Sequence, residues 1–250
     1  MANHKQNRVG EENTNKFGSY MIIKNYKQWN DIDVYFPEYD WTSKHMEYSQ
    51  FKKGQIKCPY EPRVCNIGFI GEGQYSNKEH HSCYKHWRAM INRCCNDSQY
   101  IDCEVCEEWL NFQNFAQWYE LNYYEVPREI MCLDKDILIK GNKIYSPETC
   151  CFVPNDINIL FVTRKNNRGD YPIGIKSKKK NGKFEVACSI AKNKNKERQY
   201  LGVYDSIEEA FNVYKEFKEN YIKQIADKYA YYLPLEVYTA MYNWEIEITD

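Results

Sequence analysis

Three short runs of strand-forming, mostly apolar residues occur near the start of the chain, and turn-forming residues separate them. They cover residues 20–23, 32–36 and 67–70. Short strands at this spacing are typical of a small barrel or a twisted sheet. We therefore expect a β-rich N-terminal module, a small barrel or twisted sheet, over residues 16–75. Residues 1–15 are polar and show no periodicity, which predicts a mobile arm.

From Cys83 onward the apolar positions follow a helical period. Two stripes recur at intervals of three and four residues: Tyr84, Trp87, Met90, Ile91 and Cys94, then Trp109, Phe112, Phe115, Ala116 and Tyr119. This spacing predicts two helices whose aromatic faces pack into a core. The next segment predicts, in order, a strand at 131–139, a tight turn at Gly141-Asn142, a strand at 143–145 and a helix capped by Ser146.

The last third of the chain predicts a small sheet followed by a long helix. The expected strands lie at 172–175, 184–190 and 199–204, and lysine-rich turns join them at 177–183 and 191–198. Ser206 and Glu209 form a capping box at the start of the helix, and its apolar stripe runs to Tyr221. A short helix near 235–242 and an acidic tail follow. Taken together, these patterns predict an α+β protein.

Charge is unevenly distributed along the chain, although the net charge is only −1. Residues 161–200 contain twelve Lys and Arg against three acids, whereas residues 101–130 contain seven acids and one Arg. A concentration of positive residues favours a polyanionic partner for that stretch. The acidic stretch is a candidate contact surface for a protein partner.

The eleven Cys residues occur without a signal-peptide pattern, which indicates a reducing compartment, the cytoplasm. Cys103-x-x-Cys106 has the spacing of zinc ligands, but no second pair with that spacing accompanies it. We therefore expect buried thiols rather than a structural zinc. No apolar run reaches the roughly 20 residues of a membrane span, so we expect no membrane partner.

Four strings in the basic region resemble the AP2 domain over about 55 residues: Gly174-Ile-Lys176, Tyr200-Leu-Gly202, Tyr204-Asp205 and Glu208-Glu-Ala210. In that family a three-stranded sheet rests on one helix and contacts duplex DNA with its free face. The resemblance implies DNA-binding roles for Lys176, Lys178, Lys183, Arg198 and Tyr200. Small residues, Ala187 and Ser189, stand where plant members carry Glu and Arg, which favours phosphate binding over base reading.

A second set of strings resembles the HNH unit of phage homing-type endonucleases: Leu133-Asp-Lys-Asp-Ile137, Gly141-Asn142, Ser146-Pro-Glu-Thr-Cys150 and Asn155-Asp-Ile-Asn158. The resemblance implies that Asp134 and Asn158 bind Mg²⁺ or another divalent cation, which stabilises charge on the scissile phosphate. It also implies that Asn142 shapes the turn. The candidate catalytic residues are Asp134, Lys135, Asp136 and Asn142.

Lys135 stands where the HNH family has its general-base His. A lysine with an ordinary pKa of about 10.4 does not accept a proton near neutral pH. Three explanations stay open: burial depresses the pKa of Lys135, another group acts as the base, or the site is inactive. The other candidate bases are Asp136 and the histidines His80, His81 and His86.

The order of modules as a whole resembles phage HNH proteins with a C-terminal AP2-like domain. The expected parts are the arm (1–15), the β-rich module (16–75), an HNH-like module (76–163), an AP2-like DNA-binding domain (164–232), and a C-terminal helix with an acidic tail (233–250). The expected function is binding of double-stranded DNA with metal-dependent nicking. One alternative is a DNA-binding protein without catalysis, which regulates transcription or inhibits a host factor. Another is a function directed at RNA or protein.

Overall fold

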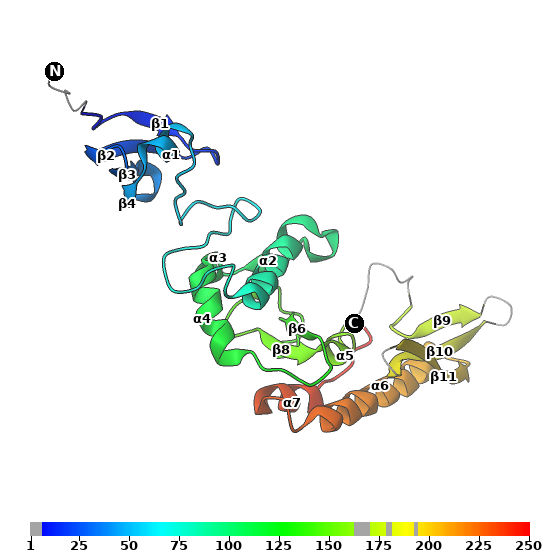
Figure 1. Cartoon of the computed structure of the whole chain (residues 1–250). Helices are drawn as coiled ribbons and strands as arrows, with labels where there is room; N and C mark the ends of the chain where they lie inside the picture. The colour runs from blue at the N-terminus through cyan, green and yellow to red at the C-terminus, as the bar shows by residue number, and fades with distance from the viewer. Residues whose placement is uncertain (1–6, 163–170, 179–181, 193–194) are drawn as a thin grey trace, which may run out of the picture. The chain divides into compact units, whose positions relative to one another are not determined.

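The computed structural model describes residues 7–162, 171–178, 182–192 and 195–250. The chain divides into two compact units, residues 1–121 and 122–250, which we call unit 1 and unit 2. Both contain helices and β-sheet (Figure 1), so the α+β class is confirmed. The unit boundary lies inside the range 76–163 that we expected to form one module.

Unit 1 contains a β-rich part followed by helices. Its elements are β1 (Glu12–Thr14), β2 (Tyr20–Gln28), β3 (Asp31–Phe36), η1 (Pro37–Tyr39), β4 (Trp41–Met46), α1 (Tyr48–Lys52), α2 (His81–Asn96), η2 (Ser98–Tyr100), β5 (Glu104–Val105), α3 (Glu107–Leu110) and α4 (Phe112–Asn122). The last residue of α4 lies just past the boundary with unit 2.

The N-terminal strands form an open antiparallel sheet in the order β1-β2-β3-β4. Alternation places Met21 and Ile23 on the buried face of β2, and Ile32 and Val34 on the buried face of β3, where they pack against Phe51 of α1. β1 and β4 pair on one side only, so the described strands do not close the small barrel that we considered.

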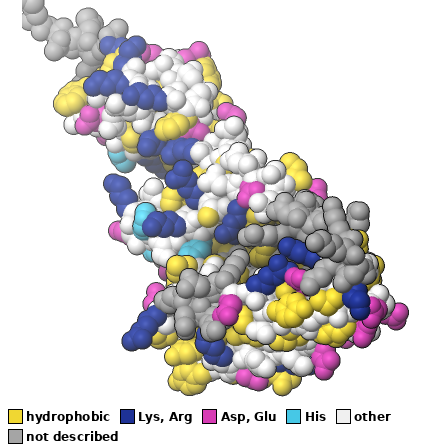
Figure 2. Space-filling model, turned by 90° about the vertical axis from the view of Figure 1, so that its right-hand side faces the viewer, with side chains coloured by type: hydrophobic (Ala, Val, Ile, Leu, Met, Phe, Trp, Pro, Cys, Tyr) yellow, Lys and Arg dark blue, Asp and Glu magenta, His cyan; other side chains and the backbone are white. Residues whose placement is uncertain are grey.

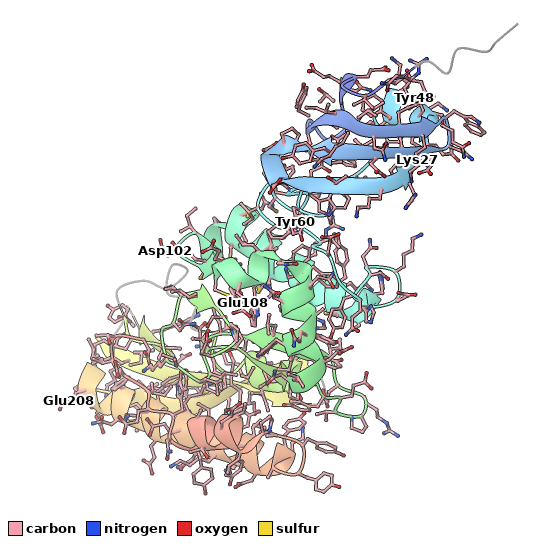
Figure 3. All side chains as sticks on the ribbon, turned by 90° about the vertical axis from the view of Figure 1, so that its left-hand side faces the viewer. Lys27, Tyr48, Tyr60, Asp102, Glu108 and Glu208 are labelled. Carbon is pink, nitrogen blue, oxygen red and sulfur yellow. The ribbon has the colours of Figure 1, made fainter. Side chains whose placement is uncertain are left out.

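Two predictions about the N-terminal region were wrong. Part of the expected mobile arm pairs with the sheet, because Glu12–Thr14 form β1 alongside β2. The hydroxyl of Tyr48 (labelled in Figure 3) holds the segment before β1, since it accepts from Arg8 Nη1 at 2.7 Å and donates to Glu11 Oε1 at 2.9 Å. The expected strand at 67–70 makes only isolated bridges. Residues 1–6 lie outside the described residues.

The helical part of unit 1 buries the predicted aromatic stripes. Trp87 of α2 and Trp109 of α3 are fully buried with Phe112 and Phe115 of α4. The indole Nε1 of Trp87 donates to the carbonyl oxygen of Trp109 at 2.7 Å, which satisfies a buried donor and fixes α2 against α3. These aromatic residues therefore form a core, as we predicted.

Unit 2 begins with a short two-stranded ladder and ends with a sheet and two helices. Its elements are β6 (Met131–Asp134), β7 (Ile144–Tyr145), β8 (Cys151–Pro154), α5 (Asn155–Asn158), β9 (Ile175–Lys178), β10 (Lys183–Lys192), β11 (Asn195–Tyr204), α6 (Ile207–Tyr229) and α7 (Leu235–Tyr242).

The prediction for residues 131–150 was wrong in two respects. The strand that we expected at 131–139 ends at Asp134, and its antiparallel partner is β8 rather than residues 143–145. No helix starts at Ser146. Residues 147–149 form a turn in which the N–H of Cys150 donates to the carbonyl oxygen of Ser146 at 3.1 Å. The helical signal of a Ser-Pro-Glu string is equally compatible with such a turn.

The C-terminal sheet has the order β11-β10-β9, and α6 packs against one of its faces. The Ser206 hydroxyl accepts from the N–H of Glu209 at 3.1 Å, so the predicted N-cap is confirmed. β10 and β11 continue through most of the expected turn at 191–198, and β9 starts at residue 175 rather than 172.

Two glycines in the AP2-like strings have structural reasons. Gly174 has a φ of +79°, and an added Cβ would lie 2.2 Å from the Tyr214 ring of α6. Gly202 has a φ of +127°, and an added Cβ would lie 2.9 Å from the Tyr204 hydroxyl oxygen. Only glycine combines these backbone angles with such close approach.

Lys218 of α6 is buried against the sheet, with 6% of its surface exposed. Burial lowers the pKa of its ammonium group, and the negative potential of the neighbouring Cys188 thiol opposes this effect. Among the described interactions, Lys218 has no hydrogen bond or ion pair with another residue. Removing water from its charged form destabilises the folded unit.

We predict that Lys218→Met raises the free energy of unfolding of unit 2 by about 1–3 kcal/mol, because burial disfavours the charged form of Lys218 and methionine fills a similar volume without a charge. The folded-state pKa of Lys218 is lowered, so the folded state binds fewer protons than the unfolded state between that pKa and the ordinary value of 10.5. The wild-type protein should therefore gain stability with rising pH in this window, and the gap to the variant should narrow. Urea unfolding across this pH range measures both effects.

The matched control is Lys223→Met, on the same helix but beside Tyr242. This substitution should not reproduce the stabilisation. A Lys218→Met protein that unfolds more easily than wild type would show that this ammonium group has a stabilising partner.

Candidate functional site

The sheet of unit 2 has one face covered by α6 and one free face. Val186 and Cys188 of β10 are buried, with exposed fractions of 0% and 1%. The register opposes Lys176 to Glu185, Arg198 to Ser189 and Tyr200 to Ala187. Directly opposed residues project to the same side of a sheet, and neighbours along a strand alternate. The register shifts between Val186 and Ala187, where Leu201 of β11 is the extra residue, so alternation along β10 is kept. Lys176, Arg198 and Tyr200 therefore share the face that α6 does not cover.

The described side chains of this free face are mixed in charge. Arg198 Nη2 lies 3.7 Å from Glu185 Oε1, and Lys183 Nζ lies 2.8 Å from Asp205 Oδ1. Tyr200 is 56% exposed. Figure 2 views the side of the chain on which β9–β11 lie in Figure 1, and it shows Lys and Arg side chains among acidic and hydrophobic ones. The register thus brings cations and an exposed aromatic ring together.

Several predicted contacts cannot be located on this face. Lys178 belongs to β9 and opposes Lys183, but its side chain lies outside the described residues. The same holds for the side chains of six further lysines of the basic stretch: Lys165, Lys179, Lys180, Lys192, Lys194 and Lys196.

The loop after β6 carries the HNH-like residues and is held together by its own side chains. Asp134 Oδ1 accepts from the N–H groups of Asp136 at 2.7 Å and Ile137 at 2.9 Å. Burial raises the pKa of the Asp134 carboxyl group, while these two hydrogen bonds lower it by a smaller amount. Asn142 Nδ2 donates to the carbonyl oxygens of Lys135 at 2.9 Å and Ile144 at 2.7 Å, so Asn142 shapes the turn as we expected.

Lys135 lies inside this loop, with 5% of its surface exposed. Its Nζ donates to both carboxylate oxygens of Asp136, at 2.7 and 2.8 Å, and to the carbonyl oxygen of Asn142 at 2.9 Å. These three contacts hold the loop together through Lys135, which we call the loop clamp. The Nζ atom is directed at oxygen atoms of the loop itself.

The two expected metal ligands do not form a described pair. Asp134 opposes Cys151 at one end of the β6–β8 ladder, whereas α5 begins beyond Pro154, at the other end. Asn158 is the last residue of α5, a short helix that begins nine residues after the expected N-cap Ser146. Among the described interactions, no hydrogen bond joins Asp134 to Asn158, and no group of three His, Cys, Asp or Glu ligands includes Asp134. The loop supplies two carboxylates for a cation, and both already bind the loop itself.

The three histidines of the 80–86 run belong to unit 1. His80 Nδ1 contacts the backbone of Ser76, 3.2 Å from its nitrogen atom, and His86 Nδ1 lies 3.0 Å from the carbonyl oxygen of Ser82. His80 and His81 border a hollow at the start of α2.

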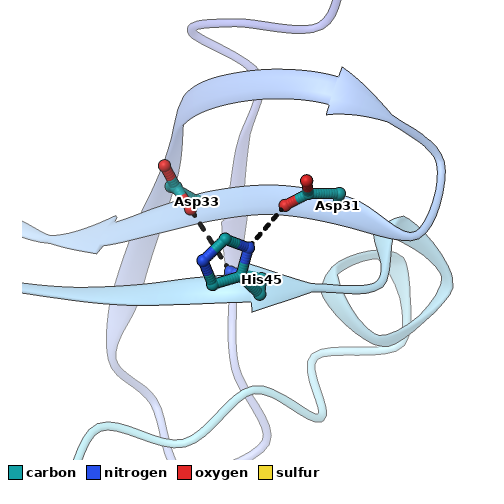
Figure 4. A group of neighbouring side chains, drawn as sticks. All are labelled: Asp31, Asp33 and His45. Carbon is teal, nitrogen blue, oxygen red and sulfur yellow. Dashed lines mark hydrogen bonds and ion pairs between the residues drawn. The ribbon is translucent and has the colours of Figure 1, made fainter.

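Sequence reasoning missed a cluster of Asp31, Asp33 and His45 on the N-terminal sheet (Figure 4), whose potential ligand atoms lie within 4.8 Å of one another. The Asp-x-Asp pattern on β3 is its only sequence signal. Asp31 binds the His45 ring at 2.9 Å and Lys27 at 3.3 Å, and Asp33 binds Asn25 at 3.1 Å. The carboxylates therefore have hydrogen-bond partners within the sheet, and exposed acidic groups of this kind are common without a metal ion.

We predict that Lys135→Met destabilises unit 2 by about 2 kcal/mol, because hydrogen bonds to charged groups contribute about 1.5–3 kcal/mol and Asp136 and the Asn142 carbonyl oxygen would lose their donor. Thermal unfolding measures the loss. Lys143→Met, on the same loop but exposed, is the control. An unchanged melting temperature for Lys135→Met would show that Lys135 does not clamp the loop.

The chain was also compared with known proteins and examined for membrane-spanning helices. No helix within the described ranges is long and apolar enough to cross a membrane. Protein-family models, curated proteins and solved structures all yield no match to the chain.

Proposed function

We propose that the protein binds double-stranded DNA through the free face of the β9–β10–β11 sheet. The observation that carries this proposal is the register, which aligns Lys176, Arg198 and Tyr200 on the face opposite α6. Cations on a narrow sheet are suited to phosphate oxygens, and a two-stranded ribbon or small sheet fits the major groove. The small residues Ala187 and Ser189 on this face support contact with the backbone more than reading of bases.

The ion pair between Arg198 and Glu185 weakens the proposed contact between Arg198 and DNA phosphate. A carboxylate 3.7 Å from the guanidinium group offsets part of its attraction for phosphate. Glu185 therefore opposes binding to any DNA sequence, and its effect should weaken as salt screens the charges.

We predict that Lys176→Ala and Arg198→Ala each weaken binding to duplex DNA and make the slope of log K against log salt shallower by about 1, since each removes one phosphate contact. Tyr200→Ala should weaken binding without changing the slope, because it removes no charge. Glu185→Gln should strengthen binding at low salt. Fluorescence anisotropy of a labelled duplex, titrated at several salt concentrations, measures all four.

Lys223→Ala provides the control, since it removes a lysine on α6 from outside the proposed face. If this control weakens binding as much as Arg198→Ala does, nonspecific attraction rather than the free face accounts for the affinity. An RNA duplex that competes as well as DNA does would favour the RNA-directed alternative.

Metal-dependent nicking by the loop after β6 is a second candidate function. Its support is the pair of carboxylates, Asp134 and Asp136, in one short loop, together with the raised pKa of Asp134. Raised carboxyl pKa values occur at catalytic sites, although buried structural carboxyls share them. A bound Mg²⁺ ion would supply stabilisation of charge on the phosphate.

We predict that plasmid nicking by the protein, if this candidate is correct, depends on Mg²⁺ or Mn²⁺ and is lost in Asp134→Asn. Asparagine retains an oxygen that can accept the two backbone hydrogen bonds of Asp134, so this variant removes the charge and keeps the turn. Asp134→Ala removes both and serves as the comparison for stability. If the wild-type protein binds duplex DNA but does not nick it with either metal, the nicking candidate is wrong and DNA binding without catalysis is favoured.

A further inference from the structure

A hollow of about 260 Å³ lies in unit 1, between the start of α2 and the second half of α4. Its wall includes the first part of the run Glu79–His86, which neither proposed function uses. Tyr75, Cys83 and Tyr119 are buried and form its floor, while Glu79 and Glu120 are exposed at its rim. An apolar floor with a few polar groups at the edge is the usual construction of a small-ligand site.

The walls of this hollow are fixed by hydrogen bonds. The Gln113 side chain is buried, and it accepts from the N–H of Tyr75 at 3.0 Å and donates to its carbonyl oxygen at 2.9 Å. The hydroxyl groups of Ser82 and Tyr119 lie 3.2 Å apart and join α2 to α4. The floor therefore has a defined position before any ligand arrives, which lowers the entropic cost of binding.

The electrostatic potential of the hollow is negative. The Tyr75 hydroxyl donates to Glu120 Oε2 at 2.7 Å, and this hydrogen bond raises the pKa of Tyr75. Burial, and secondarily the charge of Glu120, raises the pKa of Cys83 to about 12. The Glu120 carboxylate thus raises the pKa of two groups on the floor, the Tyr75 hydroxyl and the Cys83 thiol. Glu79 adds a second carboxylate, and no lysine or arginine belongs to the lining.

We propose that this hollow binds an organic cation, an alkylammonium or guanidinium group whose charge lies by Glu120 and whose stem rests on the rings of Tyr75 and Tyr119. Cations are attracted to the faces of aromatic rings, and carboxylates form strong charge-assisted hydrogen bonds with them. A polyamine and a basic side chain of another protein share this chemistry. A metal ion is less suited, because no three His, Cys, Asp or Glu ligand atoms of this lining lie within 4.8 Å of one another.

Glu120 should contribute more to cation binding than Glu79. Glu79 comes just before α2, and the positive end of that helix dipole offsets part of its charge. Glu120 lies in the last turn of α4, where the helix dipole adds to the negative potential. Removing the charge of Glu120 should therefore weaken cation binding more than removing the charge of Glu79. A general attraction of cations to acidic surfaces would not rank the two residues in this way.

The test uses the full chain and agmatine, which carries both an ammonium and a guanidinium group. NMR titration that follows the ring signals of His80 and His81 should show a saturable shift. Glu120→Gln should weaken agmatine binding about tenfold, the effect of losing one charge-assisted hydrogen bond, and Glu79→Gln should weaken it less. Glu107→Gln, an exposed acid of α3 outside the hollow, should leave the affinity unchanged.

Two further ligands separate the sources of the cation. Spermidine tests a free polyamine, and a short arginine-containing peptide tests a basic side chain; whichever displaces agmatine more effectively identifies the source. The proposal is overturned if agmatine causes no saturable shift of the histidine signals, or if Glu120→Gln and Glu107→Gln bind it equally. Because glutamine can still accept the Tyr75 hydrogen bond, loss of the fold does not explain a loss of binding, and a thermal melt of each variant checks this point. The DNA-binding face lies in the other unit, so the outcome leaves the proposed function unaffected.

Discussion

The packing of α6 against one face of the β9–β10–β11 sheet is the constraint on which the proposed function depends. The helix covers the side that bears Val186 and Cys188, and the pleat of the strands then sends the alternate residues to the other side. Gly174 allows this contact to be close, because any side chain there would meet the Tyr214 ring. Lys176 and Arg198 lie on the free face because they oppose Glu185 and Ser189, which alternate along β10 with the buried Val186 and Cys188.

The same packing buries the Lys218 side chain of α6 against the sheet, which is unfavourable for its charged form. Lys218 lies beneath the sheet without a described partner, and burial lowers the pKa of its ammonium group. The loop after β6 shows the opposite solution, because its buried lysine meets a carboxylate and a carbonyl oxygen. Within the described part of the chain, Lys135 has hydrogen-bond acceptors and Lys218 has none, although their exposed fractions are nearly equal. Burial alone therefore does not distinguish a structural lysine from a destabilising one.

Local signals in the sequence predicted local structure well. The capping box at Ser206, the aromatic stripes of α2 to α4 and the turn at Asn142 depend on neighbours a few residues apart, and the structure has all three. The partner of β6 was predicted wrongly, because residues 143–145 are nearer in the sequence and follow a turn signal, whereas the more apolar residues 151–154 pair with β6. The choice between them depends on which residues fill the core, which requires contacts across the unit.

By itself, the sequence determined the α+β class, the helical period of α2 and α6, and the alternation of apolar residues along β10. These properties follow from backbone geometry and side-chain type within a short window. Only the tertiary structure decided that Lys135 is engaged by Asp136, that Asp134 accepts backbone hydrogen bonds, and that Glu120 reaches the floor formed by Tyr75 and Cys83. The charge state and the availability of a side chain depend on what surrounds it in space, and residues distant in the chain contribute much of those surroundings.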